Sequence, residues 1–265
     1  MPFQIYSLAP LLTMPDSLSK TQVMRFNRQI VLPQIDLDGQ EKLLNARVLV
    51  MGMGGLGNAS AQSLCASGVG YLTLVDDDYV DATNLPRQIL FRDHQVGQHK
   101  VDAARDTLYA LQPACNIQIW RERPNIVDLT ALVAKHDLVL DCTDNLPSRS
   151  QINNACVVQQ TPLISGAAIR FEGQLFVYNP SESCACYACV ERLFAAPDLS
   201  CTEGGIFSPV VNIIGVQQAL LAMQLLIGFG HCPVSELRLF DGLTQQWECF
   251  RVPKFAHCSV CGTDV

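Results

Sequence analysis

Six residues in the first quarter of the chain form a glycine-rich turn of the kind that binds nucleotides. Gly52-Met53-Gly54-Gly55-Leu56-Gly57 has the pattern G-x-G-x-x-G, with a buried strand expected before it at 47–51 and a helix after it at 58–67. Such a turn lets backbone N–H groups approach a phosphate, whose charge is favoured by the N-terminus of the helix. Asp76 ends the next expected strand, where a carboxylate can hold ribose hydroxyls. The alternative is a tight turn whose glycines serve packing only.

Charged and amide side chains that could hold a polyphosphate follow the next strands. Asn84-Leu85-Pro86-Arg87-Gln88 comes after the second strand, Lys100 opens a helix, and Asp144-Asn145 follows a strand that ends at Asp141. In an open α/β sheet these positions lie at the crevice where ligands bind. Arg87 and Lys100 can neutralise phosphates, and Asp144 can hold Mg²⁺, which prefers carboxylates together with substrate phosphates. Because an enzyme of hydride transfer needs neither feature, the sequence favours a nucleoside polyphosphate over NAD.

Four of the twelve cysteines have the spacing of a metal site. They form two C-x-x-C pairs, Cys186 with Cys189 and Cys258 with Cys261. Four thiolates make a closed tetrahedral zinc site, which is structural because no coordination position is left open. Zinc would then tie a long loop over 180–206 to the C-terminal tail. The alternatives are a redox C-x-x-C motif or unpaired buried thiols, and Cys184 or His257 could replace one ligand.

The elements that must position these residues alternate between strands and helices, which predicts a mostly parallel sheet covered on both faces. After two helices within 16–45, we expect strands at 47–51, 71–75, 117–120, 137–141 and 174–178, and helices at 58–67, 100–111 and 129–134. A long apolar helix at 209–227 and a hairpin of 237–240 with 247–252 follow. The predicted fold class is α/β, a Rossmann-like doubly wound sheet with a C-terminal antiparallel extension. We expect one domain over 1–265, with N-terminal helices at 16–45, a nucleotide-binding core at 46–180 and a zinc and docking part at 181–265.

The composition argues against several classes of function. The 265 residues are 49% hydrophobic, which is ample for one large core. A net charge of −7 and a pI of about 5.1 leave no basic field for a nucleic-acid backbone. No apolar run reaches the roughly 18 residues of a membrane span, and the apolar patch 8–14 lacks the basic residues that precede a signal peptide's core. We therefore expect no nucleic acid and no membrane as partner, and a cytoplasmic location, where C-x-x-C pairs do metal or redox work.

Four segments in the same order resemble the MoeB/ThiF (HesA) family of ubiquitin-activating-like enzymes. They are Arg25-Phe26-Asn27-Arg28-Gln29-Ile30, the glycine turn, the segment 84–88 and Asp141-Cys142-Thr143-Asp144-Asn145, within a resemblance that covers about residues 20 to 262. The resemblance implies zinc at the four cysteines, Mg²⁺ at Asp144 and ribose at Asp76. Arg28 is expected to reach into a neighbouring subunit's site, which implies a homodimer. The implied ATP site comprises Gly52, Gly54, Gly55, Gly57, Asp76, Asn84, Arg87, Gln88, Lys100, Asp144 and Asn145.

The resemblance also implies a reaction, adenylation of the C-terminal glycine of a small ubiquitin-like sulfur carrier with a Gly-Gly tail. The glycine carboxylate would attack the α-phosphate of ATP, and no general base is required because a carboxylate is ionised at neutral pH. The charged groups expected to take part are Arg28, Arg87, Lys100 and Asp144. Segments 96–106 and 165–174 look closer to the enzyme that serves molybdopterin synthase, and we favour this carrier. Segments 237–242 and 76–78 look closer to the thiamine-pathway enzyme. Since the chain ends at Val265 without room for a sulfurtransferase domain, a separate protein is expected to donate sulfur.

Cys201 matches a loop cysteine that in relatives can link covalently to the carrier protein. No cation is adjacent to it in Ser200-Cys201-Thr202-Glu203, and Glu203 would raise the pKa of its thiol. A direct chemical role and a non-essential loop thiol therefore both stay open. Two other classes of function are an NAD-dependent oxidoreductase, for which no His or Tyr–Lys pair stands out near the strand ends, and a non-catalytic scaffold, which would have lost the ATP cluster.

Overall fold

A computed structural model of the chain describes residues 17–180, 183–193 and 204–262, and its centre is a single eight-stranded sheet. The strand order is β3-β2-β1-β4-β5-β6-β7-β8. The parallel strands are β1 (Arg47–Met51), β2 (Tyr71–Val75), β3 (Asn116–Trp120), β4 (Leu138–Asp141) and β5 (Leu163–Ile169). The antiparallel strands are β6 (Glu172–Tyr178), β7 (Glu236–Asp241) and β8 (Gln246–Arg251). The predicted Rossmann-like sheet with an antiparallel C-terminal extension is confirmed, whereas the division of the chain into three parts of one domain stays a prediction.

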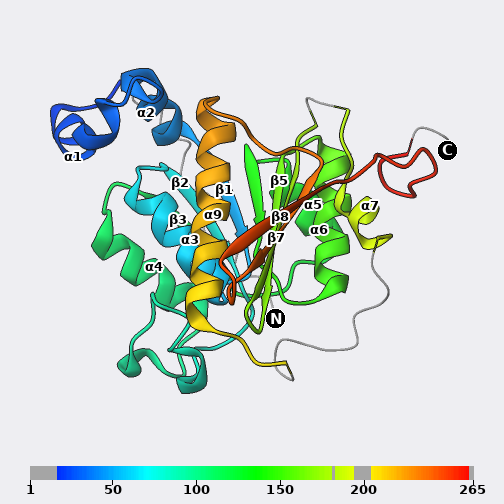
Figure 1. Cartoon of the computed structure of the whole chain (residues 1–265). Coiled ribbons are helices and arrows are strands. Elements are labelled where there is room, and N and C mark those ends of the chain that lie inside the picture. Colours follow the sequence, from blue (N-terminus) through cyan, green and yellow to red (C-terminus); the bar gives the residue numbers. More distant parts are fainter. Residues whose placement is uncertain (1–16, 181–182, 194–203, 263–265) are drawn as a thin grey trace.

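Helices cover both faces of the sheet (Figure 1). One face carries α3 (Gly55–Ala66), α4 (Lys100–Leu111) and α9 (Ser208–Ile227), and the other carries α5 (Ile126–Val133), α6 (Leu146–Gln159) and α7 (Tyr187–Glu191). The strands feed a core on each side, since side chains alternate along a strand. In β1, Val48 and Val50 join the core under α3, while Leu49 and Met51 join the core under α6.

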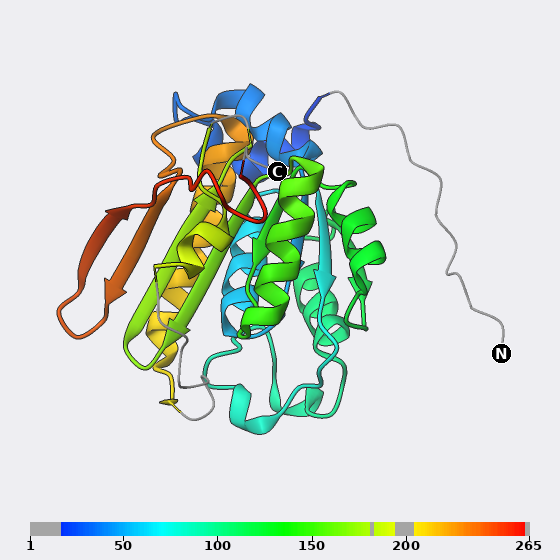
Figure 2. The same cartoon turned by 90° about the vertical axis from the view of Figure 1, so that its right-hand side faces the viewer.

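Two N-terminal helices lie at the amino ends of the parallel strands (Figure 1). They are α1 (Lys20–Ile30) and α2 (Asp36–Asn45), and α2 leads directly into β1. Two short 3₁₀ turns, η1 (Ala82–Asn84) and η2 (Asp93–Gln95), follow β2 at the opposite end of the sheet. Figure 2 shows the β7–β8 hairpin at the edge of the sheet opposite β3, where it projects from the body. Every residue of β8 is exposed.

Helix α9 corrects the expectation that no apolar segment reaches the roughly 18 residues of a membrane span. The helix has 20 residues, and an 18-residue window in it has a mean hydropathy of 1.8, so by length and composition alone it meets the requirement for a membrane span. In the fold it packs against α3, β5 and β6, and a Cβ at Gly215 would come within 2.6 Å of the Leu56 carbonyl oxygen. A helix enclosed by another helix and a sheet is apolar on most sides without a membrane.

Two elements near the later site were not expected from the sequence. Strand β5 contains Ser165-Gly166-Ala167-Ala168, small residues with little strand propensity, and it forms because β6 pairs along its whole length and β4 pairs with its first three residues. Helix α6 buries Arg149 and Asn153 on its inner face, which interrupts the apolar pattern of a helix. The expected loop at 180–206 contains the short helix α7, and α3 begins three residues earlier than predicted, inside the glycine turn.

Candidate nucleotide site and cysteine cluster

A cavity of about 350 Å³ opens at the carboxyl ends of β1, β2 and β4. The strand order reverses between β1 and β4, which is where open α/β sheets bind their ligands. Ten of the residues predicted for the ATP site line the cavity, namely Gly52, Gly54, Gly55, Asp76, Asn84, Arg87, Gln88, Lys100, Asp144 and Asn145. The structure therefore gathers in one cavity residues that lie as far apart in the sequence as Gly52 and Asn145.

The glycine turn presents backbone donors to this cavity. Gly52 has φ +91°, a left-handed conformation that favours glycine, and α3 starts at Gly55 with no side chain capping its N-terminus. A Cβ at Gly54 would meet nothing within 4 Å, so this position is open to a ligand. A Cβ at Gly57 would lie 1.9 Å from the Gly52 carbonyl oxygen, and Gly57 does not line the cavity. Gly57 thus packs α3 closely against the turn, and its place among the nucleotide contacts stays a prediction.

Asp76 is held beneath the turn by backbone donors. Its carboxylate accepts hydrogen bonds from the Met53 N–H at 2.6 Å and the Asp78 N–H at 2.8 Å. Burial raises the pKa of Asp76, while Lys100 and the two N–H donors act in the opposite direction. Lys100, the first residue of α4, is buried and forms an ion pair of 2.8 Å with Asp78. This side of the cavity therefore carries both a carboxylate suited to hydroxyl donors and a cation.

Arg87 and Gln88 present opposite hydrogen-bonding character to the cavity. The Arg87 guanidinium donates to the Asn84 side chain at 2.6 Å and to the Thr83 carbonyl at 3.2 Å. Among the described residues it forms no ion pair, so its charge is available to an anion. The buried Gln88 side-chain oxygen has no hydrogen-bond partner within the described part of the chain. An orphaned acceptor and an unpaired cation fit a ligand that carries both donor groups and phosphates.

Asp144 lies on the rim of the cavity, between β4 and α6. The side-chain oxygen of Asn145 caps α6 by accepting from the Ser148 N–H at 3.0 Å, and its amide donates to Asp144 at a long 3.4 Å. Asp144 is exposed and has no ion pair within the described ranges. An unpaired carboxylate beside phosphate-binding cations fits the way in which proteins hold Mg²⁺ with a nucleotide.

The four predicted metal ligands, Cys186, Cys189, Cys258 and Cys261, come together on the α7 side of the molecule. Their Sγ atoms all lie within 4.8 Å of one another. The Cys186–Cys258 and Cys189–Cys261 Sγ distances are 3.8 and 3.6 Å, and a tetrahedron with Zn–S bonds of about 2.3 Å has edges of about 3.8 Å. Cys184 lies outside this group and donates instead to the Asn179 carbonyl at 3.1 Å. The donor set and its spacing fit zinc.

Comparison with known proteins decides the family. A profile of the ThiF family matches residues 26–260. The chain belongs to the ThiF family. It is 44% identical over 245 residues to the molybdopterin-synthase adenylyltransferase of Escherichia coli (strain K12), a match that covers 92% of this chain and 98% of that protein.

Further similarities agree with the ThiF assignment. The chain is 43% identical over 239 residues to the sulfur carrier protein ThiS adenylyltransferase of E. coli, covering 90% of this chain and 95% of that one. Among solved structures, E. coli MccB with MccA-N7isoASN has the same fold, with a TM-score of 0.80 at 22% identity over 90% of this chain and 75% of that one. The family and fold implied by the four sequence segments are thus confirmed.

One residue singled out in the sequence, Arg28, is not in the cavity of this ThiF-family chain. Arg28 is exposed in the last turn of α1. That helix lies over the amino ends of the strands, since Phe26 packs at the turn that precedes β2, whereas the cavity is at the carboxyl ends. Cys201 lies outside the described residues.

Other residues of the cavity were not predicted from the sequence. Glu122 and Arg123 follow β3 and line the cavity, with Arg123 at 3.7 Å from Asp77. Cys142 also lines it, and burial raises the pKa of its thiol to about 12, so it is a neutral thiol rather than a nucleophile. Their position directly after strand ends was the available signal, but only the packed sheet shows that they face the same space.

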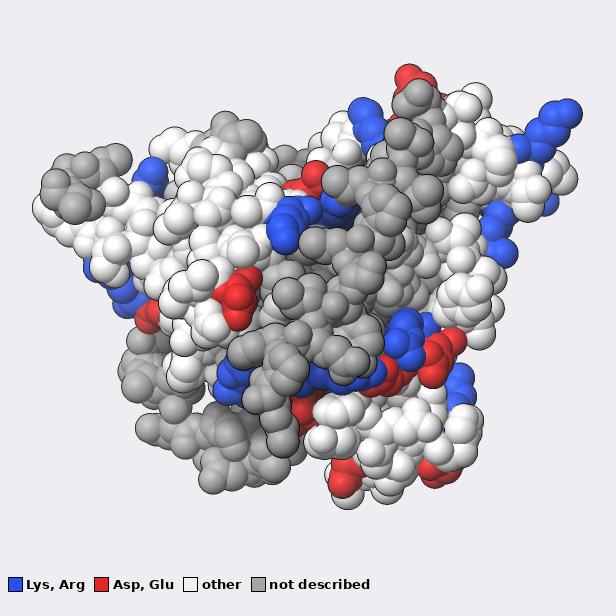
Figure 3. All heavy atoms as spheres, turned by 180° about the vertical axis from the view of Figure 1, so that it is seen from behind, with Lys and Arg blue, Asp and Glu red and all other residues white. Residues whose placement is uncertain are grey.

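The charges of the molecule are mixed in sign over the face seen in Figure 3. There Lys and Arg side chains lie beside Asp and Glu, and the coloured residues form no extended basic field. The distribution agrees with a net charge of −7.

Proposed function

We propose that this chain is an ATP-dependent adenylyltransferase that activates the C-terminal glycine of a ubiquitin-like sulfur carrier. The observation that carries the proposal is the convergence of a glycine turn, a ribose-type carboxylate, two cations and a free carboxylate on one cavity of about 350 Å³. The E. coli relatives named as adenylyltransferases are 44% and 43% identical over at least 90% of the chain, which supports the same reaction here.

The reaction forms a bond between the glycine carboxylate oxygen and the α-phosphorus of ATP. The bond from that phosphorus to the bridging oxygen of the β-phosphate breaks, and pyrophosphate leaves with the electron pair. The carrier becomes an acyl-adenylate, and no proton is transferred because the carboxylate is already ionised. The work of the protein is to hold the reactants in line and to stabilise charge.

Named residues divide this work. The free backbone N–H groups at the N-terminus of α3 bind phosphate oxygens, Asp76 accepts from the ribose hydroxyls, and Arg87 and Lys100 neutralise the developing pyrophosphate. Asp144 holds Mg²⁺, which when bound shields the phosphate charge. Asn84 orients Arg87 through the 2.6 Å hydrogen bond between them. The four cysteines hold a structural zinc that joins α7 to the C-terminal segment.

The carrier we favour is the small subunit of molybdopterin synthase. The sulfur carrier of the thiamine pathway is the second candidate, because identities of 44% and 43% to the two E. coli enzymes differ by a single percentage point. A separate protein would deliver the sulfur, and the reaction would take place in the cytoplasm, where the thiolates of a metal site stay reduced.

A homodimer completes the site in this proposal. Arg28 lies at the end of the sheet opposite its own cavity, so within one chain it has no access to ATP. From a second copy, its exposed guanidinium on α1 would reach the phosphates across the interface. Cys201 keeps its two predicted roles, as a thiol that links to the carrier or as a non-essential loop residue.

The deciding experiment is intact-mass spectrometry of each purified carrier after incubation with the protein, ATP and Mg²⁺. We expect AMP on the terminal glycine of one carrier, together with pyrophosphate release. A carrier lacking its last glycine is the matched control and stays unmodified. If neither carrier acquires AMP and no pyrophosphate is released with either of them, the proposal is overturned in favour of a non-catalytic scaffold.

A further inference from the structure

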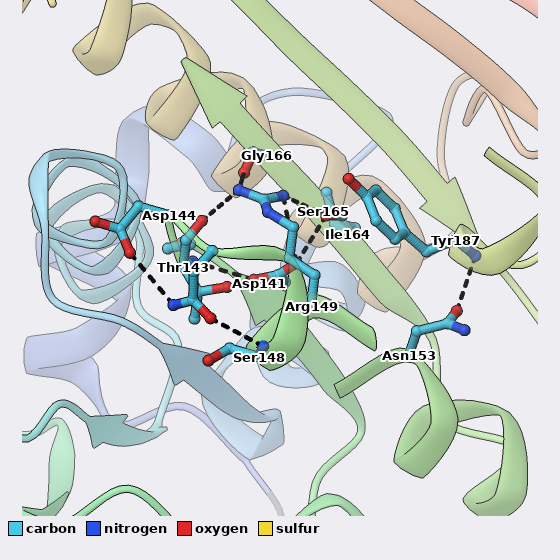
Figure 4. A network of polar contacts seen from close by, with 12 residues as sticks. Asp141, Thr143, Asp144, Ser148, Arg149, Asn153, Ile164, Ser165, Gly166 and Tyr187 are labelled. Carbon is cyan, nitrogen blue, oxygen red and sulfur yellow. Dashed lines mark hydrogen bonds and ion pairs between the residues drawn. The ribbon is translucent and has the colours of Figure 1, made fainter. Parts of the chain in front are cut away.

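A buried arginine closes the gap where β4 and β5 separate. The last pair of the two strands is Asp141 with Ser165, after which β4 ends and β5 continues to Ile169. At this point one guanidinium nitrogen of Arg149 donates to the carbonyls of both Thr143 and Gly166, the latter at 2.8 Å. Figure 4 shows the guanidinium between these two backbones, with its other terminal nitrogen directed toward Ser165. Arg149 thus bridges the loop after β4 to the neighbouring strand.

The charge of Arg149 is almost completely withdrawn from water. The residue is 5% exposed, and its partner Asp141, at 3.5 Å, is 1% exposed. Burying such a pair costs desolvation energy that the attraction only partly offsets, so the pair adds little net stability. Its geometric effect is large, because Asp141 also accepts from the N–H and the hydroxyl of Thr143 at 3.0 and 2.6 Å. Thr143 is therefore fixed through its N–H, its hydroxyl and its carbonyl.

Fixing Thr143 sets the position of the next residue, Asp144. On the far side of Asp144, Asn145 is held by its cap of α6 at 3.0 Å from the Ser148 nitrogen. The backbone is therefore anchored on both sides of Asp144, while the Asp144 carboxylate is exposed at the cavity. A carboxylate on a loop anchored in this way is pre-organised for a cation that demands near-ideal geometry.

The other side of Arg149 is supported by the cysteine cluster. Its guanidinium carbon lies 5.9 Å from the ring centre of Tyr187, within the range of a cation–π contact. Tyr187 lies inside the first C-x-x-C pair, and its N–H donates to the Asn153 side chain at 2.8 Å. The Asn153 amide in turn contacts the Cys186 sulfur at 3.6 Å. A chain of buried contacts thus joins the metal-binding helix α7 to the loop that carries Asp144.

We propose that Arg149 is a positioning residue of the adenylation site, which places the Asp144 carboxylate for Mg²⁺ and is itself held by Tyr187 of the cysteine cluster. The proposal rests on the proposed function in one respect, the role of Asp144 as the Mg²⁺ ligand. It makes the Mg²⁺ requirement of ATP binding depend on residues that touch neither ATP nor the metal.

The test is the Mg²⁺ concentration that gives half-maximal ATP binding, measured by titration calorimetry on the full chain. Arg149→Lys keeps the charge near Asp141 but loses the planar fork that spans two carbonyls. We expect its midpoint to rise about 10- to 100-fold, as for other residues that orient metal ligands. Tyr187→Leu removes the ring behind the guanidinium and should raise the midpoint about 2- to 30-fold. Arg105→Gln, on the outer surface of α4, is the matched control and leaves it unchanged.

The readout separates positioning from mere destabilisation. Saturating Mg²⁺ should restore ATP binding in both variants, because the site is displaced rather than lost. If a variant binds less ATP but at the same Mg²⁺ midpoint as the wild type, Arg149 has a structural role only and the proposal is overturned. If Arg149→Lys fails to fold, an unchanged Mg²⁺ midpoint in Tyr187→Leu overturns the proposal instead. Carrier adenylation, measured in parallel, keeps the two proposals distinct. A wild-type protein that shows Mg²⁺-dependent ATP binding without AMP transfer contradicts the proposed function alone.

Discussion

Replacing Gly54 by serine separates nucleotide binding from folding at the glycine turn. The backbone at Gly54, with φ −72° and ψ −159°, is extended and open to any residue, and a Cβ there meets nothing within 4 Å. Gly54 is also the N-cap of α3, which has no side-chain cap of its own. Serine is a preferred N-cap residue, and the change removes glycine's entropy in the unfolded chain. The free energy of unfolding should therefore rise by about 0.4–1 kcal/mol.

The same serine oxygen would occupy donors that the proposed site uses for ATP. As an N-cap it accepts from the N–H of Leu56 or Gly57, the groups at the free N-terminus of α3. Loss of one hydrogen bond to a charged phosphate costs about 1.5–3 kcal/mol. We therefore expect the Kd for ATP in Gly54→Ser to rise about 10- to 150-fold. Calorimetric titration with ATP and thermal unfolding of the same preparation measure both effects.

A neighbouring glycine is the control for this prediction. A Cβ at Gly57 would lie 1.9 Å from the Gly52 carbonyl oxygen, so Gly57→Ala should lower the free energy of unfolding by about 1–3 kcal/mol or more. The two substitutions therefore have opposite effects on the unfolding temperature. The reasoning is refuted if Gly54→Ser binds ATP within about twofold of the wild type, a difference of only about 0.4 kcal/mol, because the phosphates then do not lie against this turn.

The remaining predictions concern the metal sites and the pH dependence of stability. Asp144→Ala should lower AMP transfer to the carrier at least about 100-fold at an unchanged unfolding temperature, and undiminished AMP transfer by mass spectrometry would contradict the magnesium assignment. Cys258→Ser should lose zinc, as measured by elemental analysis, and should have a lower unfolding temperature. The control Cys249→Ser, on the exposed strand β8, should keep the zinc content and the unfolding temperature of the wild type. Equal zinc contents in the two variants would refute the assignment of zinc to the four cysteines. Burial lowers the pKa of His136 below its ordinary 6.5. The contribution of His136 to the free energy of unfolding is therefore fully present above about pH 6.5, and it is lost as the pH falls through the lower folded pKa. Denaturant unfolding of His136→Gln at several pH values should lack this decline, and an unchanged slope would assign it to other groups.

The sequence alone predicted those parts of the fold whose signals are local. Strands β1 and β2 and helix α4 have the bounds expected from their apolar runs and flanking turns. Strand β5 and helix α6 were missed because their stability comes from neighbours. The small residues of β5 are held by β6, and Ser165 also by β4. The polar residues Arg149 and Asn153 on the inner face of α6 are satisfied by groups distant in the chain.

For the candidate site, the sequence by itself determined which chemical groups are available and that they follow strand ends. That was enough to predict a nucleotide site and a four-thiolate cluster, because a parallel sheet brings all its carboxyl ends to one edge. Only the tertiary structure decided how closely Gly57 packs against Gly52, that Arg28 lies at the opposite end from the cavity of its own chain, and that Cys186 approaches Cys258 across 72 residues. It also decided that Arg149 donates to the carbonyl of Thr143, the residue before Asp144. Each of these depends on contacts between distant segments, which residue spacing does not encode.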